Sequence, residues 1–205
     1  MIPMSRKDQL NAVKWSQNRS PLSLLVFTMN GKWGTNRDND ENIVSNFLKY
    51  WKSARGAVLI QGKKRLEDLS IFVPPPLKES VVRGELAALL MTMPARLEHV
   101  GRYADMERFC RDMGSLFLWD RKMEATWQGY VIAALDGAEQ YEACDSLYDS
   151  CVPSEELASM YAERLIKRLD TNRAAEVLAP FRDSENPDIV KQLSVLERVQ
   201  AARNR

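Results

Sequence analysis

Residues 79–205 alternate stretches of helical apolar periodicity with short polar breaks, and this alternation limits the fold more than any other feature. Three breaks, Gly101-Arg102, Gly137-Ala138 and Thr171-Asn172, begin what we expect to be the second helix of a pair. They are separated by 36 and 34 residues. A period of about 34 residues with a helix–turn–helix unit is typical of stacked hairpins, because one hairpin cannot bury its apolar stripe alone. The alternative is an irregular helical bundle.

The periodicity predicts seven helices in this part of the chain, the first of them kinked or split at Pro94. Ser154 and Asn186 are predicted helix caps, each next to a proline. Three glycines are predicted to end helices: Gly101, Gly114 and Gly137. The predicted helices are 79–100, 103–113, 116–135, 138–151, 154–169, 173–182 and 187–202.

Three consecutive prolines at 74–76 mark the clearest boundary, since they can neither continue a helix nor supply donors to a sheet. We therefore expect a small basic N-terminal unit in 1–73, a connector in 74–78 and an acidic helical-repeat domain in 79–205. The front unit contains a predicted helix at 42–52. Glycines bracket a predicted strand at 57–60, and 69–73 is its expected partner. A mixed α/β unit is favoured, and an all-α unit stays open.

The net charge of +1 conceals an uneven distribution of charged residues. Residues 1–78 carry a charge of +7 and residues 79–205 a charge of −6. Such a division indicates two segments with different partners or two faces that attract each other, unless it is a chance imbalance on solvated surfaces. No stretch approaches the roughly 18 uncharged apolar residues that a membrane-spanning helix needs.

The cysteine content predicts reduced thiols in a cytoplasmic protein. There are three cysteines, an odd number, and no apolar core of a signal peptide directly follows the first residues. Buried apolar packing is the expected role of Cys110, Cys144 and Cys151. Because His99 is the only histidine, we expect no zinc site built from Cys and His, and no metal or cofactor.

Short segments of the back half resemble tetratricopeptide-like repeats. Gly101-Arg-Tyr-Ala-Asp-Met-Glu-Arg-Phe-Cys110 is similar to the start of a second repeat helix in that family. Tyr141-Glu-Ala-Cys-Asp-Ser-Leu-Tyr148, followed by Pro153, is similar too, and Arg173-Ala-Ala-Glu-Val-Leu-Ala-Pro180 is a looser match. The resemblance covers about 84–185, with 186–205 as a terminal cap. It implies a mainly α fold of helical-hairpin repeats that binds another protein.

If the hairpins stack, the first helix of each pair lines a groove that accepts a helical or extended segment of a partner protein. Tyr161, Arg164 and Arg168 fall at i, i+3 and i+7 and therefore share a helix face. The alternative is an ordinary solvated face. Another set, Trp119, Met123, Trp127 and Tyr130, shares a face of the predicted helix 116–135 and is favoured as core. The predicted partner-binding residues are Arg121, Gln128, Tyr161, Arg164 and Arg168.

The basic front supports a second function, the binding of nucleic acid. Basic side chains attract phosphates, and exposed aromatic rings such as Tyr50 and Trp51 can stack on unpaired bases. The opposing interpretation is that the tryptophans form the front core and the lysines solvate it. The residues predicted for this role are Lys49, Lys52, Arg55, Lys63, Lys64 and Arg65.

Familiar catalytic motifs do not occur in the sequence: there is no His-Glu-x-x-His, no Gly-x-Ser-x-Gly and no phosphate-binding loop. His99 is interpreted as a capping or surface residue. We therefore expect a non-enzymatic protein–protein interaction module, an adaptor, chaperone or scaffold within a larger cytosolic assembly. Self-association stays open, and nucleic-acid binding is the alternative function.

Overall fold

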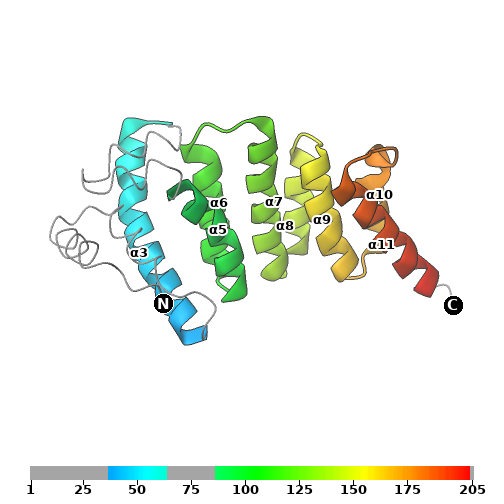
Figure 1. The fold of residues 1–205 in the computed structure, drawn as a ribbon, viewed down its shortest axis with the longest axis horizontal. Coiled ribbons are helices and arrows are strands. Elements are labelled where there is room, and N and C mark those ends of the chain that lie inside the picture. Colours follow the sequence, from blue (N-terminus) through cyan, green and yellow to red (C-terminus); the bar gives the residue numbers. More distant parts are fainter. Residues whose placement is uncertain (1–36, 64–85, 204–205) are drawn as a thin grey trace, which may run out of the picture. The chain divides into compact units, whose positions relative to one another are not determined.

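The computed structural model describes residues 37–63 and 86–203, and it is mainly helical over these ranges (Figure 1). They contain α-helices and one 3-10 turn but no strand, which confirms the expected mainly α class. None of these helices is both long and apolar enough to cross a membrane. The predicted strand at 69–73 and the connector at 74–78 lie outside the described residues, so the domain boundary stays a prediction.

The described residues form two compact units. The first holds those up to Asp105 together with Ser115–Leu118, and the second holds Met106–Gly114 and everything from Trp119 onward. The helices are α3 (Arg37–Gln61), α5 (Leu86–His99), α6 (Tyr103–Leu116), α7 (Arg121–Gly137), α8 (Tyr141–Ser150), α9 (Glu155–Lys167), α10 (Thr171–Leu178) and α11 (Pro187–Arg203), with a 3-10 turn, η3 (Ala179–Phe181), after α10.

In the first unit, α3 continues through residues 57–60, so the strand predicted there is wrong. Gly56 does not interrupt the helix, and Ile60 is 88% exposed, whereas a strand in a core would bury it. The helix ends later, before Gly62, which adopts the left-handed conformation with φ of 78°. Its N–H donates to the carbonyl oxygen of Leu59 at 3.2 Å, which ends the helix.

Contacts in the first unit join α3 to the end of α5 and to the residue before α6. Asp40, only 1% exposed, lies 3.6 Å from Nε2 of His99, and the guanidinium of Arg102 donates to Ser45 Oγ at 3.4 Å. Helix α5 passes through Pro94 without being split in two. Helix α3 precedes the three prolines in the sequence and α5 follows them, yet both belong to one compact unit.

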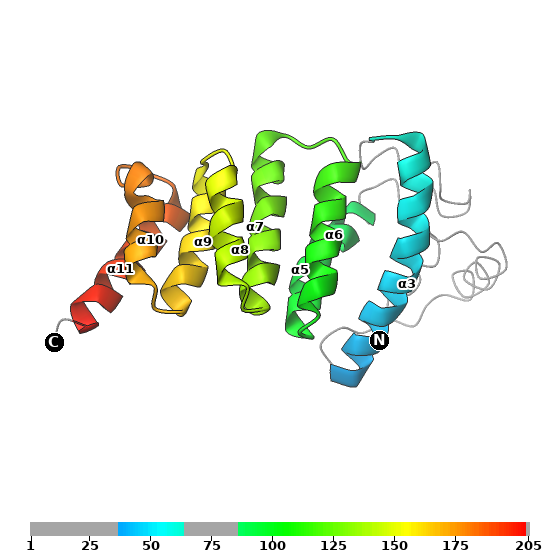
Figure 2. The ribbon, with the colours of Figure 1, turned by 180° about the vertical axis from the view of Figure 1, so that it is seen from behind.

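The second unit is a row of first helices with second helices packed against it. Helices α7, α9 and α11 contact one another in turn; α8 packs on α7, and α10 packs on α9 and α11. Figure 1 views the unit from the side of α7 and α9, and Figure 2 views it from the side of α8 and α10. The turns within the helix pairs lie at one end of the helices, and the links into α9 and α11 lie at the opposite end.

The three turns that reverse the chain between paired helices have the same geometry. Gly101, Glu139 and Leu169 occupy the left-handed region with φ of 74°, 59° and 64°. At each turn, the N–H of the next residue donates to a leucine carbonyl five residues earlier, at 2.8 to 2.9 Å. This is the Schellman arrangement, which satisfies carbonyls at the end of a helix. The leucines, Leu97, Leu135 and Leu165, are all buried.

The links between hairpins begin and end elsewhere than predicted. Gly114 lies inside α6, where an added Cβ would be 3.8 Å from Cβ of Trp127, and α7 begins only after its cap, Asp120. The predicted helix 173–182 is instead α10 followed by a 3-10 turn that contains Pro180. Helices α7, α9 and α11 begin at Arg121, Glu155 and Pro187, which are separations of 34 and 32 residues.

An aromatic cluster forms the core where α6 meets α7 in the second unit. Trp127 is 1% exposed, and its ring centroid lies 5.6 Å from that of Trp119, 5.7 Å from that of Tyr130 and 6.3 Å from that of Phe109. Trp119 lies in the link rather than in a helix, and its Nε1–H donates to the carbonyl of Met113 at 2.7 Å. The preference for core over binding site is therefore confirmed for Trp127.

We expect Leu169→Gly to stabilise the chain by about 0.5–1 kcal/mol, because glycine adopts positive φ without the Cβ clash of leucine. Little packing is lost, since Leu169 is 60% exposed. Gly101→Ala should destabilise by about 1 kcal/mol through backbone strain alone, because its Cβ would meet no atom within 4 Å. Urea unfolding measures both. Leu169→Ala, which keeps the strained φ, is the control; equal stability of the alanine and glycine variants would contradict the assignment.

Candidate interaction surfaces

A cleft of about 740 Å³ opens on the row of first helices in the second unit. It lies between the first half of α7, the start of α9 and the link that leads into α11. We call it the first-helix cleft. It is lined by Lys122, Thr126, Glu155, Glu156, Ser159, Met160, Ser184, Glu185, Asn186, Pro187 and Asp188.

Side-chain caps fix where the helices around this cleft begin. Asp120 accepts a hydrogen bond from the N–H of Met123 at 2.8 Å at the start of α7. Ser154 accepts one from the N–H of Leu157 at 3.2 Å, and Asn186 accepts one from the N–H two residues later at 3.0 Å. The predicted caps at Ser154 and Asn186 are thus confirmed. Each cap satisfies a backbone donor that a helix start leaves unpaired.

The cleft is acidic. Glu155, Glu156, Glu185 and Asp188 line it against a single cation, Lys122. Nζ of Lys122 lies 3.4 Å from Oε1 of Glu156, which connects α7 with α9. Carboxylates in the first turn of a helix also offset its partial positive charge. Four carboxylates and one ammonium nevertheless leave an excess of negative charge in the cleft.

One of these carboxylates holds the link into α11 in place. Glu155 Oε1 accepts a hydrogen bond from Ser184 Oγ at 2.5 Å, and Oε2 accepts one from Asn186 Nδ2 at 3.0 Å. These two hydrogen bonds lower the pKa of Glu155 from its ordinary value. In contrast, Glu185 and Asp188 are exposed, and neither side chain has a hydrogen bond or ion pair with another described residue.

The floor of the cleft is formed where α7 and α9 approach closely. Gly129 of α7 leaves no room for a Cβ, because the thioether of Met160 occupies that space. Ser159, beside Met160 on α9, is 7% exposed and lines the cleft. Its hydroxyl makes no hydrogen bond with any residue in the described ranges. The glycine therefore permits the close approach, and the serine offers a hydroxyl to whatever enters.

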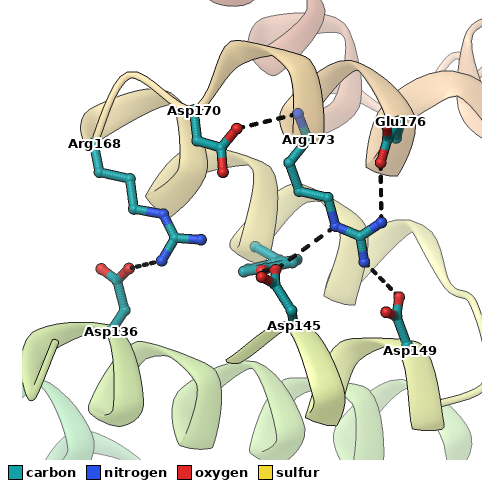
Figure 3. A network of polar contacts seen from close by, with 8 residues as sticks. Asp136, Asp145, Asp149, Arg168, Asp170, Arg173 and Glu176 are labelled. Carbon is teal, nitrogen blue, oxygen red and sulfur yellow. Dashed lines mark hydrogen bonds and ion pairs between the residues drawn. The ribbon is translucent and has the colours of Figure 1, made fainter. Parts of the chain in front are cut away.

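A network of ion pairs joins α8 and α10, and Figure 3 shows its geometry. The guanidinium of Arg173 lies 3.6 Å from Asp145, 2.5 Å from Asp149 and 3.1 Å from Glu176. Burial lowers the pKa of Arg173, but the hydrogen bonds to Glu176 and Asp149 raise it above its ordinary value. Asp145 also accepts a hydrogen bond from the hydroxyl of Tyr161. Each of these three carboxylates is thus paired with a donor group of the chain itself.

A second ion pair joins the ends of the helices at the hairpin turns. Nη1 of Arg168 lies 3.2 Å from Asp136, and both side chains are 16% exposed (Figure 3). The same guanidinium lies over the ring of Tyr141, 4.4 Å from its centroid. These contacts connect the C-terminal cap of α9 with the last turn of α7 and the first turn of α8.

The five predicted partner-binding residues do not meet in one groove, and none of them lines the first-helix cleft. Tyr161 is fully buried against Tyr148, with ring centroids 4.9 Å apart, and Arg168 is held by Asp136. Arg164 and Gln128 are half-buried, and Arg121 is exposed at the start of α7. The i, i+3, i+7 spacing identifies side chains on one face, but for Tyr161 and Arg168 that face packs against neighbouring helices.

The predicted nucleic-acid-binding residues are only partly described. Lys49, Lys52 and Lys63 are exposed and Arg55 is half-buried, whereas Lys64 and Arg65 lie outside the described residues. Trp51 is 4% exposed and stacks on Phe47, with ring centroids 6.2 Å apart. This tryptophan therefore belongs to the core of the first unit and offers no face for stacking on a base.

The three cysteines have raised pKa values, and burial is the main cause in each. Burial raises the pKa of Cys110, and burial followed by Asp136 raises the pKa of Cys144 to about 11. The thiol of Cys144 donates to the carbonyl of Ile132 at 3.6 Å. Over residues 37–63 and 86–203, no three His, Cys, Asp or Glu side chains are placed to hold a metal ion.

The sequence identified Asn186 as a cap but gave no connection between this residue and Lys122, Glu155 or Ser184. A usable signal was present. Caps recur at Asp120, Ser154 and Asn186. The residues after each cap form the first turn of a helix, and these first turns lie at the same end of the unit. Polar residues near those starts are therefore candidates for a shared surface.

Arg173→Ala is expected to destabilise the chain by about 1–2 kcal/mol, because it removes one cation from three carboxylates that then repel one another. Urea unfolding measures the loss. Arg198→Ala is the matched control, since Arg198 is exposed and donates to Ser194 on its own helix at 3.2 Å. It should cost less than about 0.5 kcal/mol. Equal losses from both variants would show that the network contributes nothing specific.

Glu155 should make stability depend on pH. Because its pKa is lowered in the folded chain, its contribution is present above the ordinary value of 4.5 and is lost as the pH falls through the lowered pKa. Glu155→Gln should therefore be less stable than the parent at neutral pH, and the difference should shrink as the pH falls below 4.5. Thermal melts over a pH series measure this. A difference that stays constant with pH would rule out the ionised form as the source.

The two faces of the second unit thus differ in chemistry. On the side of α8 and α10, Arg173 pairs with Asp145, Asp149 and Glu176, whereas the first-helix cleft keeps exposed carboxylates. Comparison with known proteins adds no relative: no family model, no curated protein and no solved structure matches this chain.

Proposed function

We propose that this chain is a non-enzymatic protein-binding module that presents the first-helix cleft to a partner. The cleft itself is the observation that supports this function. Its volume of about 740 Å³ is large enough to admit several side chains. Small-molecule sites are mostly apolar with a few polar groups, but this lining consists mainly of Glu, Asp, Ser, Thr, Asn and Lys. A polar, open cleft of this kind suits a segment of another macromolecule.

The regularity of the hairpins supports a repeat of the tetratricopeptide-like type. The turns at Gly101, Glu139 and Leu169 have equal geometry, and the starts of α7, α9 and α11 are 34 and 32 residues apart; both are properties of such repeats. Stacked hairpins commonly use a row of first helices to hold a partner segment. Adaptor, chaperone and scaffold roles within a larger assembly all need this property.

The state of the ionisable groups supports binding over catalysis. Glu155 is held by Ser184 and Asn186, the hydroxyl of Tyr161 donates to Asp145, and burial raises the pKa of Cys144. A general base or nucleophile needs a pKa near the working pH and access to a substrate. These groups instead have structural partners or pKa values shifted away from neutrality.

Nucleic-acid binding through the front remains a second candidate because Lys49 and Lys52 are exposed one turn apart on α3. Counterion release from such lysines favours phosphate backbones. The burial of Trp51 against Phe47 counts against this candidate, since that ring cannot stack on a base. The cleft therefore supports protein binding more strongly.

Site-specific photo-crosslinking in the host cell tests the function. A benzoylphenylalanine at Thr126, which lines the cleft, should give discrete protein adducts. The same group at Ser146, exposed on α8, is the matched control and should not give them. Absence of adducts from Thr126, or the same adducts from both positions, would refute a partner at the cleft. Adducts at Thr126 that nuclease shortens would contain nucleic acid and would contradict a protein partner at the cleft.

A further inference from the structure

We propose that the first-helix cleft recognises an extended basic segment of the partner, one that places arginine or lysine side chains among its carboxylates. This inference rests on the proposed function and names the chemistry of the partner. It depends on three features of the cleft: its excess negative charge, a serine hydroxyl in its lining without a hydrogen-bond partner among the described residues, and an ion pair between Lys122 and Glu156.

Charge complementarity selects the partner. Glu185 and Asp188 are exposed carboxylates without a described side-chain partner, and Glu156 is only 29% exposed. An incoming guanidinium can donate two parallel hydrogen bonds to such a carboxylate, which fixes its orientation as well as its position. A segment rich in acidic residues would instead face repulsion from all four carboxylates of the lining.

The floor provides a polar group that is not satisfied by the chain. Ser159 is 7% exposed and lines the cleft, and its hydroxyl has no hydrogen-bond partner among the described residues. This hydroxyl is not among the described side-chain atoms that are buried without a hydrogen bond, so it is open to the cleft, where backbone N–H and C=O groups of an extended segment can pair with it. Ser159 is therefore placed to contact the backbone of the bound segment while the carboxylates bind its side chains.

Lys122 acts as an internal competitor for the bound cation. Its ammonium lies 3.4 Å from Glu156 and its side chain is 73% exposed, so the ion pair is of the weak, solvated kind. An incoming arginine replaces this contact with a two-point one. Removing Lys122 should therefore tighten the binding of a basic segment, because Glu156 would then be available and a like charge would be gone.

Fluorescence anisotropy with two labelled peptides tests the proposal. The probes are Gly-Ser-Arg-Gly-Ser-Arg-Gly-Ser and its counterpart with Glu in place of Arg, measured on the full chain at low salt. We expect the arginine probe to bind and the glutamate probe not to bind. Glu156→Gln combined with Glu185→Gln should weaken the arginine probe by roughly fivefold or more. Equal binding of both probes would overturn the proposal.

Two matched controls separate the cleft from the overall charge of the chain. Glu124 is an exposed first-turn acid of α7 that does not line the cleft, so Glu124→Gln should change affinity by less than about twofold. Lys122→Ala should tighten the arginine probe by about threefold, whereas Arg121→Ala, which removes the same charge one residue earlier, should not. A gain in affinity cannot result from misfolding. Equal effects at Lys122 and Arg121 would refute a specific site.

The two proposals fail in different ways. If Thr126 crosslinks to a partner but the arginine probe does not bind, the basic-segment inference falls and the protein-binding function stands. If neither the crosslink nor the probe is seen, both fall. If the probe binds with the expected variant pattern but no partner crosslinks at Thr126, the cleft is a cation-binding surface and the proposed cellular function is wrong.

Discussion

A left-handed residue reverses the chain within each helix pair, and the second unit depends on this constraint. At Glu139 and Leu169 the backbone turns within three residues while a buried leucine carbonyl accepts the closing hydrogen bond. The next helix must then run antiparallel and pack on the one before it. One such reversal and one link between hairpins separate consecutive first helices, so α7, α9 and α11 start at the same end of the unit. That end is where their caps and first-turn acids gather.

The same composition serves two purposes on the two faces of this unit. Asp145, Asp149 and Glu176 surround Arg173, so these carboxylates hold α8 and α10 together. Glu185 and Asp188 form no ion pair with a described residue and are exposed at the cleft. Some carboxylates of the acidic back half therefore hold helices together, whereas others are exposed at the cleft. The position of each arginine decides which carboxylates are neutralised.

Much of the helical part could be predicted from the sequence, because period, caps and prolines act over a few residues. Ser154 and Asn186 begin α9 and α11 as expected, and Trp127 is core. The predicted strand at 57–60 was wrong because residues on either side continue a helix that Val44 and Phe47 anchor by burial. The candidate site was largely missed. The residues that line the cleft come from α7, α9 and the link into α11. The spacing of residues within one helix does not indicate which helix starts are adjacent in space.

By itself, the sequence determined that the back half consists of short paired helices, where α9 and α11 begin, and that the chain carries an excess of acid there. These properties follow from neighbours in the chain. Only the tertiary structure decided that Tyr161 and Arg168 face other helices while Glu156 and Ser159 face a cleft. The physical reason is that a helix presents side chains in every direction, and which direction is buried depends on the helices that pack against it.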